Sequence, residues 1–159
     1  MESKLLNAMR AYFGEDLKRI THAEQVLGFA KQIMRVEGGV ERIIIPTAIL
    51  HDIGIKECER KYGSSAGDLQ EKEGPAIARN ILEKFDFTDQ EIAEICEIIG
   101  SHHTRGKIDT LNFKIIWDAD CLVNLNDQLQ IKEMVDKIFF TNTAKKIFLG
   151  GMENATKFS

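Results

Sequence analysis

The chain has 159 residues, of which 43% are hydrophobic and 29% are charged, as is usual for a globular protein of one domain. Its 21 lysines and arginines stand against 25 aspartates and glutamates, and this net charge of −4 argues against nucleic-acid binding through a general basic field. The longest apolar stretch, IIIPTAIL at 43–50, is too short to span a membrane, so we expect a cytoplasmic protein without a membrane partner.

Helical periodicity dominates the first third of the chain. Residues 2–13 predict a short amphipathic helix, and apolar residues at 23–34 recur at the spacing of a second helix. A third helix is predicted at 40–53, with Gly54 just past its end. Pro46 lies inside this segment, so the helix must kink there or begin later.

Breakers and caps divide the middle of the chain. The glycines and serines of 62–74 predict a loop, which is also a candidate lid, and Pro75 is suited to open a helix that runs to about residue 85. Thr88 and Glu91 have the spacing of a capping box, which predicts the start of another helix.

The apolar stripe of this last helix, at 92, 95 and 99, continues to His102. The remaining predicted elements are a polar loop at 104–110, helices at 112–125, 128–140 and 142–149, the last ending at the glycine pair 150–151, and a frayed tail at 151–159. Because no β-alternation is evident, we expect an all-α, single-domain helical bundle of about seven to eight helices over residues 1–159, with a motif core at about 16–127 and C-terminal helices at 128–150.

All four histidines fall at helix ends or on inward-facing stripes. His22 borders the apolar stripe of the second helix, His51 and Asp52 close the third, and His102 and His103 follow the helix capped by Thr88. Taken singly, each is more often a structural residue than a ligand. Taken together, they are better explained by a bound divalent cation.

Asp118 and Asp120 add carboxylates to this set, and both have apolar neighbours at helical spacing, so periodicity does not choose between them. A buried acid needs a partner, because an unpaired buried carboxylate is very costly. Imidazole and carboxylate ligands suit Mn, Fe, Co, Ni or Zn and accommodate Mg. The three cysteines, Cys58, Cys96 and Cys121, form no CxxC pair, so we expect free thiols and no closed structural zinc site.

Four segments resemble, in order, the H…HD…D pattern of the HD-domain metal-dependent phosphohydrolase superfamily. They are THAEQV at 21–26, AILHDIG at 48–54, SHH at 101–103 and DADCLVNL at 118–125. The resemblance implies that His22, His51, Asp52 and one of the two later acids bind one metal ion. The pattern A-D-x-L at 119–122 matches the one around the family's ligand aspartate, so the resemblance implies Asp120 as the ligand instead of Asp118.

Some branches of that superfamily hold two or three metals with further histidines, and His102 and His103 resemble the later of these. The earlier one has no counterpart here, because the segment DLQEKEGPAIA carries Gln70, Glu71 and Glu73 instead. We therefore expect one cation, and His102, His103 and Glu73 are candidates to bind either a second cation or the substrate phosphate.

The resemblance predicts a metal-dependent phosphohydrolase that cleaves a phosphate ester of a small metabolite, most plausibly a nucleotide, in a monomer or homodimer. We expect Asp52 or Asp118 to orient the attacking water, and Lys56 and Arg105, the cations nearest the ligands in sequence, to bind substrate. Two alternatives remain open. One is a di-iron oxygenase of the same fold, and the other is a sensory module that binds a nucleotide or metal without turnover.

Overall fold

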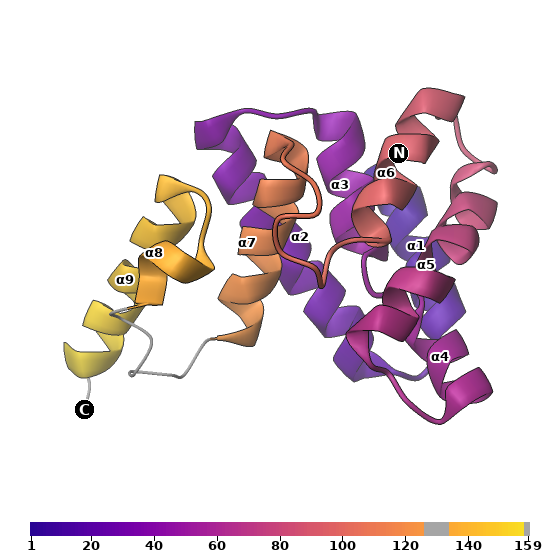
Figure 1. The fold of residues 1–159 in the computed structure, drawn as a ribbon, viewed down its shortest axis with the longest axis horizontal. Coiled ribbons are helices and arrows are strands. Elements are labelled where there is room, and N and C mark those ends of the chain that lie inside the picture. Colours follow the sequence, from indigo (N-terminus) through magenta and orange to yellow (C-terminus); the bar gives the residue numbers. More distant parts are fainter. Residues whose placement is uncertain (126–133, 158–159) are drawn as a thin grey trace.

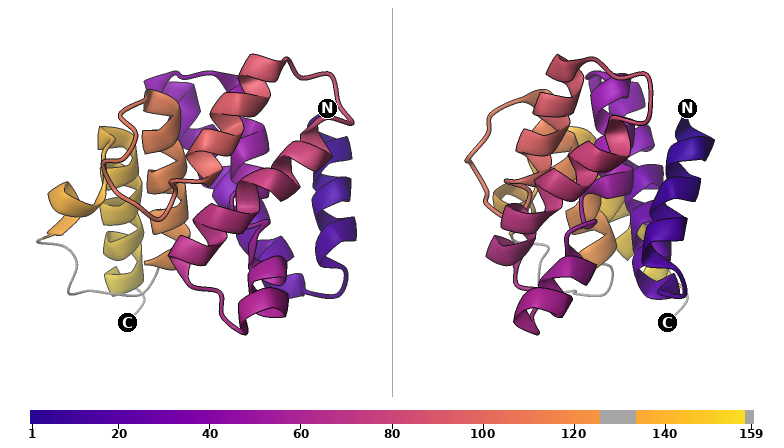
Figure 2. Two further views of the ribbon diagram at one scale, coloured as in Figure 1. Left: turned by 45° about the vertical axis from the view of Figure 1, so that its right-hand side comes forward. Right: turned by 90° about the vertical axis from the view of Figure 1, so that its right-hand side faces the viewer.

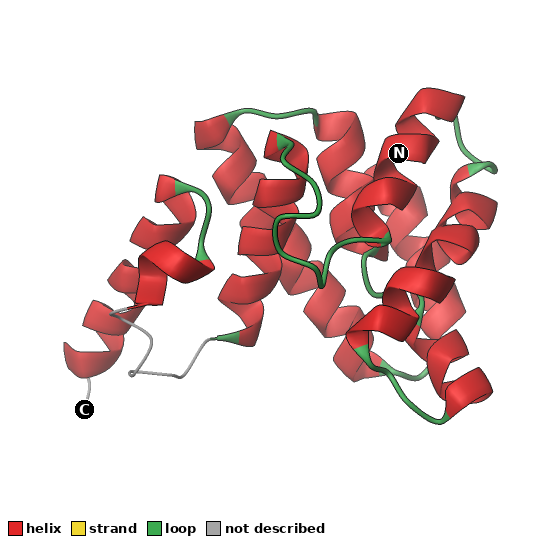
Figure 3. Cartoon of the chain, in the orientation of Figure 1, coloured by secondary structure: helices red, strands yellow, loops and turns green. Residues whose placement is uncertain are grey.

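The computed structural model describes residues 1–125 and 134–157, which form helices and, within those ranges, no strand (Figures 1 and 3). The prediction of an all-α protein is therefore confirmed. The helices are α1 (Glu2–Phe13), α2 (Leu17–Glu37), α3 (Glu41–Leu50), α4 (Ile55–Tyr62), α5 (Gly67–Leu82), α6 (Asp89–Ile99), α7 (Leu111–Asn124), α8 (Val135–Ile138) and α9 (Asn142–Lys157).

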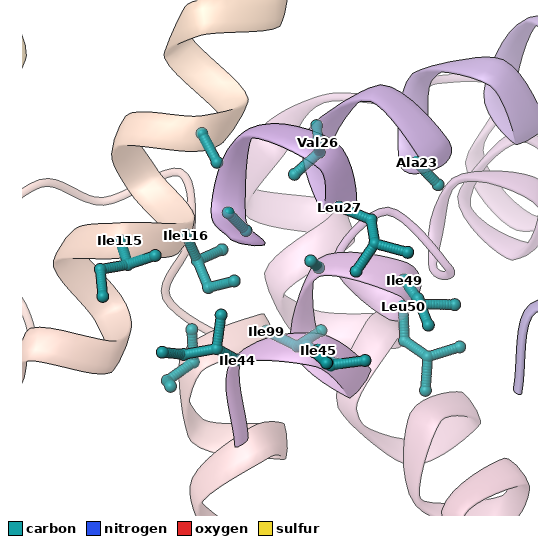
Figure 4. Close-up of a cluster of buried hydrophobic side chains, with 14 of the residues drawn as sticks. Ala23, Val26, Leu27, Ile44, Ile45, Ile49, Leu50, Ile99, Ile115 and Ile116 are labelled. Carbon is teal, nitrogen blue, oxygen red and sulfur yellow. The ribbon is translucent and has the colours of Figure 1, made fainter. Parts of the chain in front are cut away.

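Helix α3 lies at the centre of the bundle, and every side chain from Ile43 to Leu50 is buried. A helix that is apolar all round must be covered on all sides. Helices α1, α2, α6 and α7 pack against it, and Figure 4 shows isoleucine and leucine side chains of α2, α3, α6 and α7 meeting in one cluster. This core fixes the ends of α2, α3, α6 and α7, which carry the histidines and aspartates singled out above.

The middle of the chain differs from the sequence prediction. The capping box of Thr88 and Glu91 is present, but α5 begins at Gly67 and contains Pro75, so most of the predicted loop and lid at 62–74 is helical. Gly67 is needed there for space, because a Cβ would lie 2.8 Å from the His103 ring. The glycine that suggested a loop instead allows α5 to approach the histidine pair.

The C-terminal segment also departs from the prediction. Helix α9 continues through Gly150 and Gly151 to Lys157, where a helix ending at 149 and a frayed tail were expected. Glycine inside a helix costs only about 1 kcal/mol relative to alanine, so it weakens a helix without ending it. Much of the helix predicted at 128–140 falls at 126–133, outside the described residues.

Helices α8 and α9 lie beside α7 at one end of the molecule, away from α4 and α5 (Figure 2). The start of α9 is tied to the end of α2, because the Thr143 backbone N–H and hydroxyl both donate to Glu37 Oε1, at 3.0 and 2.6 Å. Within the described residues, no helix is long and apolar enough to cross a membrane.

Candidate metal centre

The His51-Asp52 pair lies in a tight turn between α3 and α4. Helix α3 ends at Leu50, and α4 begins only three residues after Asp52. Gly54 makes this turn possible, because a Cβ at that position would lie 2.9 Å from the Gly74 backbone nitrogen. The backbone of the turn is therefore packed directly on α5, which holds the two side chains at a fixed place at the end of the central helix.

Four donor atoms from three parts of the chain meet at this turn. His22 Nε2, from α2, lies 3.2 Å from His51 Nε2, 3.4 Å from Asp52 Oδ2 and 3.0 Å from Asp120 Oδ1, which comes from α7. His51 Nε2 lies 3.5 Å from Asp52 Oδ2 and 3.6 Å from Asp120 Oδ1. Bonds of ~2.0–2.2 Å to a divalent cation put neighbouring ligand atoms ~3–3.5 Å apart, so this spacing fits a metal ion.

Hydrogen bonds outside the cluster orient two of these ligands. His51 Nδ1 lies 2.9 Å from the Ala48 carbonyl, to which it can only donate, so its Nε2 is left as the atom that faces the cluster. Asn124 Nδ2 donates to Asp120 Oδ1 at 3.0 Å. Such partners fix the tautomer and direction of metal ligands in proteins. Sequence reasoning missed Asn124, although its i+4 spacing from Asp120 on one helix was visible.

The electrostatics of the cluster call for a positive charge among these atoms. Burial alone would lower the pKa of His51, but the carboxylates of Asp52 and Asp120 raise it to about 9. Burial likewise opposes ionisation of both acids, yet His51 and His102 lower the pKa of Asp52 to about 2, and His22 and His51 hold the pKa of Asp120 well below its usual range. A proton or a divalent cation can supply that charge, and the two compete for the same atoms.

A second group of potential ligands shares Asp52. Ligand atoms of Asp52, His102 and His103 lie within 4.8 Å of one another, and His102 Nε2 is 3.4 Å from Asp52 Oδ1. His102 Nδ1 lies 2.7 Å from the Ile99 carbonyl and donates to it, which leaves Nε2 buried without a hydrogen-bond partner in the described structure. A bound metal ion, or a water molecule bound to it, would give this buried nitrogen the partner that it lacks.

Helix α5 supplies a glutamate to this second group, but not the one expected. Glu73 instead binds Lys61 Nζ and the Tyr62 hydroxyl, each at 2.7 Å. Glu71 accepts from the His103 backbone N–H and the Thr104 hydroxyl, both at 3.0 Å, and so positions the histidine loop. Residues 71 and 73 are two positions apart and so lie about 200° apart around α5, and Glu73 faces Lys61 and Tyr62 instead of the second group.

Asp118 lies away from the cluster and is completely buried. Its carboxylate accepts hydrogen bonds from the backbone N–H of Phe140 at 2.8 Å and from the N–H and hydroxyl of Thr141 at 2.6 and 2.7 Å. These donors precede α9, so Asp118 anchors the C-terminal helix to α7. The structure therefore places Asp118 apart from the cluster, where it was expected to orient the attacking water.

The two cations expected to bind substrate are engaged elsewhere. Lys56 Nζ donates to the Tyr12 carbonyl at 2.8 Å and lies 5.4 Å from the centroid of the Tyr12 ring. The Arg105 guanidinium carbon lies 4.0 Å from the centroid of the Phe140 ring, at the side where α8 and α9 attach. Although both residues are close to the ligands in sequence, neither side chain has its contacts at the cluster.

Comparisons with known proteins agree with this picture. Residues 19–125 match the HD domain family. A crystal structure of a predicted HD superfamily hydrolase from an uncultured Thermotogales bacterium is similar over 98% of this chain and 87% of that chain, with a TM-score of 0.75 and 28% sequence identity. No curated protein matches the chain.

Proposed function

Because this chain belongs to the HD-domain family, we propose that it is a metal-dependent phosphohydrolase that cleaves a phosphate ester of a small metabolite, most plausibly a nucleotide. The family match and the hydrolase similar in structure support the broader statement, a metal-dependent hydrolase. The preference for phosphate esters and for nucleotides is the part that we propose here.

One observation carries the proposal, namely the approach of His22, His51, Asp52 and Asp120 to within metal-ligand spacing at the end of the central helix. These four residues would hold the cation. When bound, it would lower the pKa of water at the site and offset the charge that develops on the phosphoryl oxygens. The chain itself has a net charge of −4, so affinity for a phosphate must arise locally.

The remaining polar atoms support hydrolysis. Asp52 presents Oδ2 to His22 and Oδ1 to His102, so one carboxylate can hold the cation and also orient a water by its second oxygen. Because His102 Nδ1 donates to the Ile99 carbonyl, Nε2 is the atom that faces Asp52 Oδ1 and can contact a water held there. The His102 side chain is buried and that of Asp52 is 15% exposed, which limits competition from bulk water for these atoms.

The test is a metal analysis followed by a substrate panel. We expect the purified protein to bind at least one divalent cation per chain and, with Mn²⁺, Co²⁺ or Mg²⁺, to release phosphate from p-nitrophenyl phosphate and from nucleotides. His51→Ala and Asp52→Ala should abolish release while circular dichroism stays helical. A protein that binds no divalent cation, or full activity in both variants, would contradict the proposal.

The same panel separates the alternatives. Asp52 belongs to both groups of potential ligands, so two cations could bind side by side, as a di-iron oxygenase requires. An activity that needs iron and oxygen, with no cleavage of a phosphate ester, would support that alternative. If no compound is converted but a nucleotide raises the melting temperature, the sensory-module hypothesis is supported instead.

A further inference from the structure

An open pocket of about 520 Å³ adjoins the candidate metal centre on the side of α2 and α7. Its volume is within the range of ~300–1,000 Å³ that is common for small-molecule sites. Helix α2 lines it with Leu17, Lys18, Thr21, His22 and Gln25, and α7 contributes Val123 and Asn124. The pocket therefore shares one candidate ligand, His22, with the cluster, and an occupant of the pocket would contact that side chain.

The register of α2 places the polar side chains of this pocket on one face of the helix. Lys18 and His22 are four residues apart, as are Thr21 and Gln25, and residues at this spacing lie one above the other. The Lys18 side chain therefore stands one turn from His22, at a distance that its four-carbon stem can cross. Across the pocket, Asn124 binds Asp120, so both walls are tied to metal ligands.

Lys18 differs from the other cations near the centre in having no assigned partner. Its side chain is exposed, and among the described residues it makes no ion pair within 4.0 Å. The nearby acids Asp16 and Glu59 are both bound by Arg19 instead. A lysine that has no ion-pair partner among the described residues and stands beside a histidine–carboxylate cluster is suited to pair with an anion that reaches both.

We propose that this pocket binds the substrate and that Lys18 pairs with its phosphate, while the organic part lies along Leu17 and Val123 within reach of Gln25. This inference rests on the proposed function and makes it narrower. The substrate class is a phosphomonoester whose organic group presents an apolar face and at least one hydrogen-bonding edge. Lys18 thus takes the role that sequence proximity had suggested for Lys56 and Arg105.

Phosphate binding tests the role of Lys18 without relying on turnover. Inorganic phosphate is titrated calorimetrically into the Mn²⁺-loaded protein, and Lys18→Ala is compared with Lys4→Ala, which removes an exposed lysine of α1 that does not line the pocket. We expect Lys18→Ala to weaken phosphate binding about 5- to 20-fold, the size of a charge-assisted contact, and Lys4→Ala to change it less than about twofold. Equal phosphate affinity in the two variants would overturn the assignment.

A titration with Mn²⁺ alone separates this inference from the proposed function. Lys18→Ala should keep the Mn²⁺ affinity of the wild type, because the ammonium is not a ligand; a loss of Mn²⁺ binding would contradict the assignment. If the wild type binds phosphate through Lys18 but cleaves no ester, the proposed hydrolysis fails and the pocket stands. If it cleaves esters and Lys18→Ala leaves KM and kcat unchanged, the pocket assignment fails and the proposed hydrolysis stands.

A bulky substitution tests the place of the organic group. Thr21→Trp fills the pocket from its exposed helical wall. We expect the KM of a nucleoside monophosphate to rise at least about tenfold, while binding of inorganic phosphate changes less than about twofold. An unchanged KM for the nucleoside monophosphate would show that its organic group lies elsewhere, against the proposal.

Discussion

Helix α7 carries two aspartates, two residues apart, that serve two different regions of the molecule. Asp120 faces His22 and His51 in the candidate metal centre, whereas Asp118 faces the backbone N–H groups of residues 140 and 141 and anchors the segment that leads into α9. The residues are rotated by about 200° around the helix axis, so they occupy opposite sides of α7. Both sides are covered, one by α2 and the other by the C-terminal helices.

The partners of the two carboxylates distinguish a candidate metal ligand from an anchor. Burial raises the pKa of Asp118 above its ordinary value, although its three fixed donors oppose this. At Asp120 burial acts in the same direction, but His22 and His51 outweigh it and hold the pKa well below its usual range. The imidazole partners of Asp120 carry lone pairs that can bind a cation in place of a proton, whereas the two backbone N–H groups and the hydroxyl that face Asp118 donate hydrogen bonds to it. Burial of an acid on a helix is therefore weaker evidence for a site than the chemistry of its partners.

The largest expected effect is on hydrolysis, and it should separate the two acids. Asp120→Asn removes a charged ligand atom and should lower kcat/KM at least about 100-fold with any phosphate ester that the wild type cleaves. Asp118→Asn is the matched control on the same helix and should keep activity within about threefold at 25 °C. Steady-state kinetics with saturating Mn²⁺ measure both. If Asp118→Asn were the more damaging variant, the division of labour along α7 would be wrong.

The second prediction concerns metal binding and stability. A cation present at 100 times its dissociation constant stabilises a folded protein by about 2.7 kcal/mol, which corresponds to a rise of ~5–10 °C in melting temperature at this chain length. We expect this rise on adding Mn²⁺ to the metal-free wild type and to Asp118→Asn, but not to Asp120→Asn. Differential scanning calorimetry with and without EDTA gives the comparison. Equal shifts in all three proteins would mean that Asp120 is not a ligand.

The helices that could be predicted are those specified by local signals. The capping box of Thr88 and Glu91 involves residues three apart, and both its hydrogen bonds are present. The start of α5 at Gly67 could not be read locally, because it depends on the close approach of that glycine to His103, which is distant in sequence. Similarly, glycine spacing alone could not tell that α9 continues past residue 151.

The candidate site shows the same limit. The histidines and the HD pair were recognisable by type and order, but the choice between Asp118 and Asp120 required a family register, since both faces of α7 carry apolar neighbours. Lys56 and Arg105 were chosen for their closeness in sequence to the ligands. Lys18, which we propose as the phosphate-binding cation, precedes His22 by one helical turn, and the same i, i+4 rule that defines helix faces places the two on one face.

The third prediction concerns the anchor itself. Asp118→Asn places an amide NH₂ against backbone donors, so at least one of three buried hydrogen bonds is lost, at a cost of about 1–3 kcal/mol in the free energy of unfolding. Urea denaturation monitored by Trp117 fluorescence measures it, since Trp117 is the only tryptophan and its Nε1 donates to the Ile138 carbonyl at 3.0 Å. An unchanged free energy of unfolding in Asp118→Asn would contradict the assigned anchor.

The smallest expected effect is the pH dependence of the second tie to α9, between Glu37 and Thr143. Hydrogen bonds from the Thr143 hydroxyl and backbone N–H hold the pKa of Glu37 below its ordinary value of 4.5. Because the folded pKa is the lower one, this carboxylate contributes stability above pH 4.5 that is lost as the pH falls through the folded pKa. Glu37→Gln should therefore lower the free energy of unfolding by about 1 kcal/mol at pH 7 and by less near pH 3.

The control is Glu15→Gln, which removes an exposed acid between α1 and α2. Its free energy of unfolding should not approach that of the wild type as the pH falls. A Glu37→Gln deficit that stays constant from pH 7 to pH 3 would mean that the ionised carboxylate is not what ties α9 to α2.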